Sequence, residues 1–414
     1  MKTYFTEQTG FFGKSKPSGL LREFGSPLYL YNETILRERC REIAGLISYP
    51  RFKPNYSIKA NSNPELLKII KEEGFDADAV SPGEVHILLA SGFKPEEILF
   101  VANNISIEEM KYALDKGVPA SCDSISQLRQ YGRLNPGGAA VVRFNTGIGA
   151  GHHEKVITGG GDTKFGVNME LTGEVKDVLK EYGLRLIGVN QHIGSLFMDA
   201  APYVSAVKSL LSVAEQFEEL EFIDMGGGLG IPYHKQDGQK RMNLGDLGGR
   251  LSDLLVDWTE ARQKDIRVKM EPGRYITAEC GVLLGTVHAV KQNGGRTYAG
   301  TDVGFNVLIR PAMYDSYHDI EIYESDLIVK TEETKVVSVT GNICETGDVL
   351  AKDRELPPVR EGNIIGIMDA GAYGYSMSSN YNCRLRPAEV LVGLDGMPRL
   401  IRRRELMEDL MRFF

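Results

Sequence analysis

The chain has 414 residues, of which 42% are hydrophobic and 25% are charged, and its formal net charge at pH 7 is -8. This length exceeds one ordinary globular core and predicts two domains. No run approaches the roughly 20 apolar residues that span a bilayer, so a membrane protein is not expected. The acidic charge balance provides no basic field, so nucleic acid is not an expected partner.

The cysteines indicate neither a disulfide framework nor a metal site. Five are present, spread without a CxxC pair: Cys40, Cys122, Cys280, Cys344 and Cys383. An odd number with this spacing predicts thiols that are mostly reduced and buried, and no metal is expected. The first residues show no apolar segment ahead of a cleavage site, so no secretory signal is predicted and a cytoplasmic location is expected.

From residue 28 to 280, β-type runs alternate with segments of helical period. The β-type runs lie at 28–31, 55–58, 77–80, 98–101, 139–144, 185–189, 221–225 and 266–270. The first four are followed by helical segments at 33–46, 64–73, 83–91 and 107–115. This alternation predicts a parallel sheet with helices outside, and about eight units over roughly 250 residues is the size of a (β/α)8 TIM-like barrel.

After residue 280 the pattern changes to short β-rich runs separated by turn residues. These runs lie at 282–290, 297–300, 327–329, 335–339, 364–368 and 388–392. They predict a second, mainly antiparallel β-domain of barrel or sandwich type. We therefore expect an α/β chain with a barrel over 28–280 and a β-domain over 281–414, on which residues 1–27 pack.

Four of the predicted barrel strands end in polar residues or glycine. Lys59 follows the run at 55–58 and precedes a helix start with Asn63 as its cap; His192 follows 185–189, the glycines of 226–230 follow 221–225, and Glu271 follows 266–270. Because the carboxyl ends of barrel strands meet at one face, these groups should share a cleft. An amine, an imidazole, a glycine loop and a carboxylate can together hold a phosphorylated aldehyde cofactor such as pyridoxal phosphate.

Each of these residues also has an ordinary structural interpretation. Lys59 could be a surface lysine, the glycine run a tight turn, Glu271 a helix N-terminal acid and His192 a buried structural histidine. The glycine run fails the dinucleotide-binding fingerprint, because GxGxxG counted from Gly226 requires glycine where Ile231 stands. In the predicted β-domain, Arg310 could bind a carboxylate or form an interdomain salt bridge, and Cys344 could deliver a proton or be a buried structural thiol.

Six motifs taken in order are similar to those of one enzyme family. They are YSIKANS at 56–62, HIGS at 192–195, GGGLG at 226–230, EPGR at 271–274, CETGD at 344–348 and NYNCRLRPAEV at 380–390. They resemble the pyridoxal-phosphate-dependent decarboxylases of the alanine-racemase-like barrel fold, specifically the branch that decarboxylates diaminopimelate to lysine. The resemblance covers nearly the whole chain.

The resemblance implies a role for each matching residue. Lys59 would bond the cofactor aldehyde, His192 would stack on its ring and Glu271 would contact its pyridine nitrogen. The residues implied around the phosphate or its neighbours are Ser195, Gly227, Gly228, Gly273, Arg274 and Tyr373. The residues implied for the substrate are Arg274, Arg310, Tyr314 and Tyr373, mainly at its distal carboxylate, and Glu345 at its distal ammonium.

The family also implies an assembly and a proton donor. Cys344 and Glu345 would enter the active site of the partner subunit, so a homodimer with shared active sites is expected. Cys344 would protonate the product, although the sequence leaves a lysine amine as an alternative donor. Leu196 stands where the family usually has glutamine, and 147–166 resembles a loop over the substrate.

Two other functions remain open from the sequence alone. One is a related decarboxylase of ornithine, lysine or a carboxylated polyamine; Arg310 and the Cys344–Glu345 pair disfavour it, because those substrates lack the second carboxylate at the distal end. The other is a racemase or cofactor carrier on the same barrel, which would release no carbon dioxide.

Overall fold

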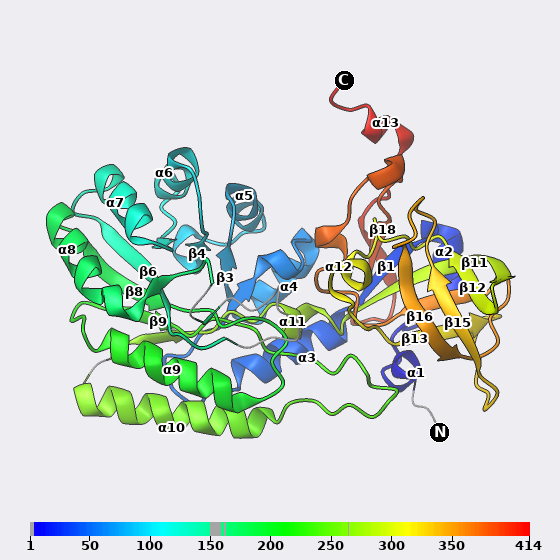
Figure 1. Ribbon diagram of the computed structural model, residues 1–414, viewed down its shortest axis with the longest axis horizontal. Coiled ribbons are helices and arrows are strands. Elements are labelled where there is room, and N and C mark those ends of the chain that lie inside the picture. Colours follow the sequence, from blue (N-terminus) through cyan, green and yellow to red (C-terminus); the bar gives the residue numbers. More distant parts are fainter. Residues whose placement is uncertain (1–3, 150–158, 161–162, 264) are drawn as a thin grey trace. The chain divides into compact units, whose positions relative to one another are not determined.

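The computed structural model describes residues 4–149, 159–160, 163–263 and 265–414. The chain divides into two compact units, whose elements are labelled in Figure 1. The barrel unit comprises Glu38–Ile231 and Arg241–Ile276, and the β unit comprises Met1–Arg37, Pro232–Lys240 and Thr277–Phe414. The sequence placed the boundaries near 28 and 280, whereas the chain also leaves the barrel unit after the glycine run and returns nine residues later.

The barrel unit contains eight parallel strands in the order β10-β9-β8-β6-β5-β4-β3-β2. They are β2 Asn55–Ser57, β3 Asp76–Ala79, β4 Ile98–Val101, β5 Ala120–Cys122, β6 Ala139–Asn145, β8 Arg185–Asn190, β9 Phe222–Asp224 and β10 Arg267–Lys269, and the short β7 Val167–Asn168 pairs with β6. The first and last strands meet, because Phe52 bridges Val268 and the Asn55 N–H donates to the Met270 carbonyl at 2.7 Å. The expected barrel is confirmed.

Two strand predictions require correction. The run at 28–31 is strand β1, Leu28–Asn32, which lies in the β unit between β11 and β18 and does not open the barrel. All five residues of β1 are buried, so its sequence has the continuous apolar character of a barrel strand. The eighth barrel strand is instead β5, whose residues Ala-Ser-Cys carry no β-branched side chain and gave no strand signal.

The barrel helices that follow β2, β3, β4 and β5 begin at side-chain caps. Asn63 Oδ1 accepts from the Glu65 N–H at 3.0 Å, as expected, and Ser81, Ser106 and Ser124 cap the next three helices in the same way. Helix α3, Glu33–Ala44, follows β1 and begins in the β unit. The other helices are α4 Pro64–Glu72, α5 Pro82–Ala90, α6 Ile107–Asp115, α7 Ile125–Leu134, α8 Thr172–Tyr182, α9 Ala200–Ala214, α10 Leu244–Arg262 and α11 Arg274–Thr277. These four caps fix where the helices after β2, β3, β4 and β5 begin.

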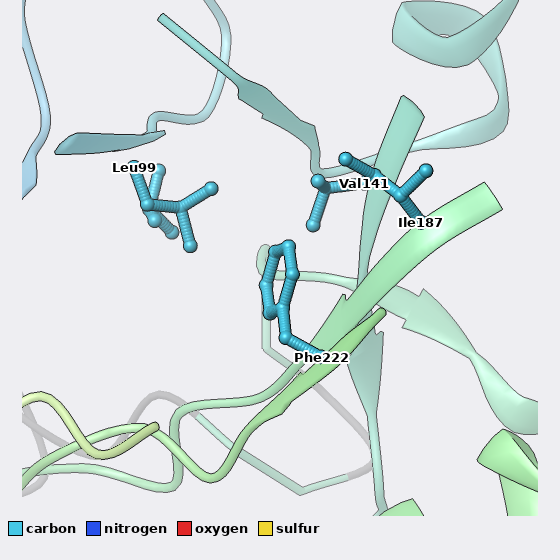
Figure 2. Close-up of a cluster of buried hydrophobic side chains, with 5 residues drawn as sticks. Leu99, Val141, Ile187 and Phe222 are labelled. Carbon is cyan, nitrogen blue, oxygen red and sulfur yellow. The ribbon is translucent and has the colours of Figure 1, made fainter. Parts of the chain in front are cut away.

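The barrel interior is packed by apolar side chains from several strands. Figure 2 shows Phe222 of β9 pointing toward Leu99 of β4 and Val141 of β6, with Ile187 of β8 alongside. A Cβ at Gly188 would stand 2.3 Å from the Phe222 ring, which explains the glycine there. The barrel is therefore a filled core, and its strand ends are rigid supports.

The β unit is built on one ten-stranded sheet whose described pairings are antiparallel except for β1 with β18 and β12 with β15. Its strands are β1, β11 Gly281–Asn293, β12 Arg296–Thr301, β13 Ile320–Glu324, β14 Leu327–Ile328, β15 Lys335–Thr340, β16 Val349–Leu356, β17 Ile364–Ile367, β18 Ala388–Val392 and β19 Pro398–Arg402. Short helices accompany them at α1 Phe5–Gln8, α2 Pro17–Phe24, α12 Arg310–Tyr314 and α13 Met407–Leu410. The expected mainly antiparallel domain is confirmed.

The N-terminal segment is held to this sheet by hydrogen bonds. The Thr6 N–H donates to the buried Glu321 carboxylate at 3.2 Å, and the Ser18 N–H donates to Asp326 at 2.7 Å. Within the described parts of the chain, no helix has the length and apolarity needed to cross a membrane.

We expect Phe222→Ala to destabilise the barrel unit by about 3–5 kcal/mol, because the truncation leaves a cavity in a close-packed interior. The matched control is Phe413→Ala, since the Phe413 side chain is 88% exposed. The free energy of unfolding in urea measures the difference, and equal values for the two variants would contradict the packing described for the barrel.

Candidate active site

Lys59 lies where the sequence predicted, in a 3-10 turn at Ile58–Ala60 directly after β2. Its Nζ is 3.5 Å from Oδ2 of Asp78, which is the second-last residue of the neighbouring strand β3 and is 1% exposed. The Ser57 hydroxyl donates to the other oxygen of Asp78 at 2.8 Å. Its place beside a buried carboxylate distinguishes Lys59 from an ordinary surface lysine. The Lys59 side chain is 32% exposed, so a ligand can reach the amine.

His192 is a neutral imidazole held by the glycine loop. The Gly227 N–H donates to Nδ1 at 3.2 Å, so that nitrogen is an acceptor. Burial and the positive charges of Lys59 and Arg143 lower the pKa of His192 well below its usual value. The 3.8 Å approach of Nδ1 to Glu271 is therefore not an ion pair at pH 7.

Glu271 follows β10 and is 2% exposed. Burial and the negative charges of Asp224 and Asp78 raise the pKa of Glu271 well above its usual value. Neither Oε1 of Glu271 nor Oδ2 of Asp224 receives a donor from the described residues when both are ionised, and a hydrogen bond between the two side chains lowers the pKa of Asp224. One proton shared between the two side chains satisfies both oxygens, and the raised pKa of Glu271 is the reason to assign it to that residue.

The glycine loop packs on the backbone of its neighbours. A Cβ at Gly227 would stand 1.8 Å from the Glu271 carbonyl oxygen, and Gly226 and Gly228 have φ of +74° and +112°. The Gly230 N–H donates to the Phe197 carbonyl at 2.9 Å, which pairs this loop with the loop after β8. Close packing alone requires glycine at these positions. The absence of side chains there also leaves backbone groups accessible to a ligand.

Ser195 and Arg274 meet beside this loop. Arg274 Nη2 donates to the Ser195 hydroxyl at 2.9 Å and Nε lies 3.3 Å from the same oxygen. A guanidinium and a hydroxyl at one point suit a phosphate. Gly273 precedes Arg274 and lies so close to β2 that its Cβ would stand 2.9 Å from that of Ser57.

The barrel unit thus gathers eight predicted residues at the carboxyl ends of β2, β8, β9 and β10. They are Lys59, His192, Ser195, Gly227, Gly228, Glu271, Gly273 and Arg274.

Three residues of this site were missed by sequence reasoning. Asp78 lies beside the Lys59 amine. Asp224 accepts a hydrogen bond from the Gly226 N–H at 2.9 Å, and burial raises the pKa of Asp224 to about 6. Arg143 lies 3.5 Å from the His192 carbonyl oxygen and 3.6 Å from Asp123. Each is a charged residue within or at the end of an otherwise apolar barrel strand. A search for charges in buried runs would have found them.

The β unit carries the other predicted residues. Arg310 begins α12 and is 2% exposed; its Nη2 donates to the Ser316 hydroxyl at 3.1 Å. Tyr314 is the last residue of the same helix. Tyr373 follows β17 with φ of +57°, an uncommon conformation for a bulky residue.

Cys344 and Glu345 lie on an exposed loop between β15 and β16. Asp348 anchors the loop by accepting from the Ile343 and Phe305 N–H groups, both at 2.7 Å. The Cys344 N–H donates to Asn382 at 3.0 Å, and the Tyr381 hydroxyl donates to Glu345. Because Cys344 is exposed, the alternative of a buried structural thiol is wrong.

The other cysteines and the predicted substrate loop remain to be placed. No disulfide joins the five cysteines, all in described parts of the chain; Cys40, Cys122 and Cys280 are buried, while Cys383 is exposed like Cys344. Much of the predicted loop at 147–166 lies outside the described residues. No cluster of acidic, histidine and cysteine side chains suited to a metal ion occurs among the residues that are described.

Comparison with known proteins assigns the family. Residues 34–278 match the family described as "Pyridoxal-dependent decarboxylase, pyridoxal binding domain". Diaminopimelate decarboxylase of Methanothermobacter thermautotrophicus is 42% identical over 95% of this chain and 92% of its own length. The chain belongs to the diaminopimelate decarboxylase family of pyridoxal-dependent decarboxylases.

Solved structures agree with this assignment. The Helicobacter pylori diaminopimelate decarboxylase complexed with L-lysine has a TM-score of 0.86 at 29% identity, over 95% of this chain and 98% of that one. The M. jannaschii diaminopimelate decarboxylase in complex with L-lysine has a TM-score of 0.82 at 32% identity, over 95% and 92%. The chain is therefore a carboxy-lyase that uses pyridoxal phosphate, and the acid pair and the Arg274–Ser195 donors fit the ring nitrogen and phosphate of that cofactor.

We expect the cofactor-free protein to become less stable as pH rises, relative to Glu271→Gln. The pKa of Glu271 is raised in the folded protein, so stability is lost once the pH exceeds 4.5, the ordinary pKa at which the unfolded chain ionises. The slope is about 1.4 kcal/mol per pH unit at most. Urea unfolding of both proteins between pH 5 and pH 7 measures it, and parallel pH profiles would contradict a protonated Glu271.

Proposed function

We propose that the enzyme decarboxylates meso-2,6-diaminopimelate to L-lysine and carbon dioxide, the final step of lysine biosynthesis by the diaminopimelate pathway. The observation that carries the proposal is the buried guanidinium of Arg310 in a chain whose relatives, over nearly their full length, are diaminopimelate decarboxylases. The L-lysine in the related H. pylori complex supports lysine as the product.

Lys59 would bond the aldehyde carbon of the cofactor, and its position beside Asp78 supports this role. The ring supplies an electron sink for the pair left when carbon dioxide departs. Glu271 would hand its proton to the pyridine nitrogen and remain ionised beside it, which keeps that sink strong. His192, neutral and held by Gly227, would lie on the ring without adding a positive charge.

Six residues would hold the phosphate and its surroundings. Their backbone N–H groups, hydroxyls and guanidinium supply the donors that a phosphate requires. These residues are Ser195, Gly227, Gly228, Gly273, Arg274 and Tyr373.

The distal end of the substrate would decide specificity. Arg310, with Tyr314 and Arg274, would bind the distal carboxylate, and Glu345 would bind the distal ammonium. Tyr373 would also contact the substrate. Lysine or ornithine placed with its α-carbon at the cofactor has no distal carboxylate and would leave the buried Arg310 unpaired by substrate, at a cost of several kcal/mol as an order of magnitude.

The proposed assembly is a homodimer in which Cys344 and Glu345 complete the active site of the partner subunit. Both side chains are exposed on the β unit of a single chain, which is compatible with use at a second subunit. Cys344 would deliver the proton that replaces carbon dioxide. A cytoplasmic location is part of the same proposal, since the product is consumed in protein synthesis.

We expect purified protein with pyridoxal phosphate to form carbon dioxide and lysine from meso-diaminopimelate, and no gas from L-lysine, L-ornithine or carboxynorspermidine. Lys59→Ala should abolish turnover, whereas Lys68→Ala, a change at an exposed helical lysine, should not. Gas from one of the other substrates would contradict the roles of Arg310 and Glu345, and α-proton exchange without gas would indicate a racemase.

We expect Cys344→Ala to lower kcat by about 10²–10⁴-fold, the usual contribution of a positioned acid. The matched control is Cys383→Ala, because Cys383 is also an exposed thiol of the β unit. Mixing Cys344→Ala with Lys59→Ala chains should restore about one quarter of wild-type activity, since half the two-fold dimers then contain one intact site. No restoration after subunit exchange, as verified by mass spectrometry, would contradict shared active sites.

A further inference from the structure

Within the β unit, Arg310 contacts three neutral side chains from two segments of the chain. Its guanidinium lies 5.2 Å from the centroid of the Tyr233 ring, Nη2 donates to the Ser316 hydroxyl at 3.1 Å, and Nε lies 3.4 Å from Nε2 of His318. Arg310 and His318 are each 2% exposed. The orientation of the guanidinium is therefore set by its contacts and not by solvent.

The tautomer of His318 follows from its two partners. Nδ1 lies 2.8 Å from the Met368 carbonyl oxygen, which can only accept, so Nδ1 carries the hydrogen. Nε2 faces Arg310 Nε, which can only donate, so Nε2 carries none. His318 is thus a neutral ring that donates on one side and accepts on the other, and no other ordinary side chain of this shape does both.

The ring of His318 is itself fixed. Tyr233 packs edge to face against it, with centroids 5.3 Å apart and an interplanar angle of 81°. The Arg354 guanidinium donates to the His318 backbone carbonyl at 3.1 Å. Tyr233 belongs to the Pro232–Lys240 segment, which returns to the β unit directly after the glycine loop.

We propose that His318 and Tyr233 are positioning residues that aim the Arg310 guanidinium at the distal carboxylate of the substrate. Two of the five N–H groups of the Arg310 guanidinium point to His318 and Ser316, which fixes the plane of the guanidinium. Tyr233 covers one face of that plane. The distal carboxylate is bound by other N–H groups of the same fork. This inference rests on the proposed function, because it assigns the source of specificity within that site.

The chemistry of the ligands provides a direct test. Meso-diaminopimelate and the product L-lysine both carry the distal carboxylate and ammonium, because the reaction removes the carboxylate at the other end. Cadaverine carries neither carboxylate. A residue that aims Arg310 must affect binding of the first two and leave cadaverine unaffected.

The experiment uses the cofactor-loaded enzyme with His318→Phe, His318→Gln and the control His288→Phe, whose histidine is 62% exposed. His318→Phe should raise KM for diaminopimelate and the inhibition constant of L-lysine together by about 10- to 100-fold, the usual effect of losing a buried hydrogen bond to a charged group. It should change kcat less than about threefold and leave inhibition by cadaverine unchanged. His318→Gln, which restores an acceptor, should recover part of the loss.

Three results would overturn the inference. They are an unchanged KM in His318→Phe, an equal rise for cadaverine, and an effect on kcat alone. If His318→Phe does not fold, Tyr233→Leu and His318→Gln are measured in the same way, and wild-type values for both overturn it. Failure of the wild-type enzyme to form lysine would instead refute the proposed function, so the two failures are distinguishable.

Discussion

The barrel site depends on the cost of burying negative charge. Glu271, Asp224 and Asp78 lie at or near the carboxyl ends of three strands of one barrel and are each at most 2% exposed. Three ionised carboxylates cannot share such a space, so a proton stays on Glu271 while Lys59 and Arg143 offset part of the remaining charge. Burial and the positive charges of Lys59 and Arg143 lower the pKa of the neighbouring His192 and keep it neutral. The protein thus maintains an acid, a base and an uncharged ring side by side at neutral pH.

The backbone holds these charges in place. The filled barrel interior fixes the strand ends, and glycines at 226–228 bring the loop after β9 against the loops of its neighbours. Because Gly227 donates to His192 and Gly226 donates to Asp224, one loop sets both the tautomer of the imidazole and the charge of the acid pair. A cofactor with a basic ring nitrogen and a phosphate fits the donors and the proton that this arrangement provides.

Local sequence predicted what local physics determines. The Asn63 cap, strand β4 and helix α6 were placed correctly, because capping and periodicity act over a few residues. The partner of β1 could not be predicted, since a strand buried on both faces looks alike in either sheet. Strand β5 was missed for want of β-branched residues. Lys59, His192 and Glu271 were found because each follows an apolar run, whereas the charged residues inside such runs were overlooked. The return of Pro232–Lys240 to the β unit is a tertiary event with no local signal.

The most direct test of this account is the protonation of Glu271, followed by difference infrared spectroscopy at pH 7 with Glu271→Gln as the reference. The account predicts the carbonyl stretch of a protonated carboxyl group in the cofactor-free enzyme, absent from the variant, and its disappearance when pyridoxal phosphate binds. A band that is missing without the cofactor, or that persists after loading, would contradict the claim that Glu271 keeps its proton for the ring nitrogen.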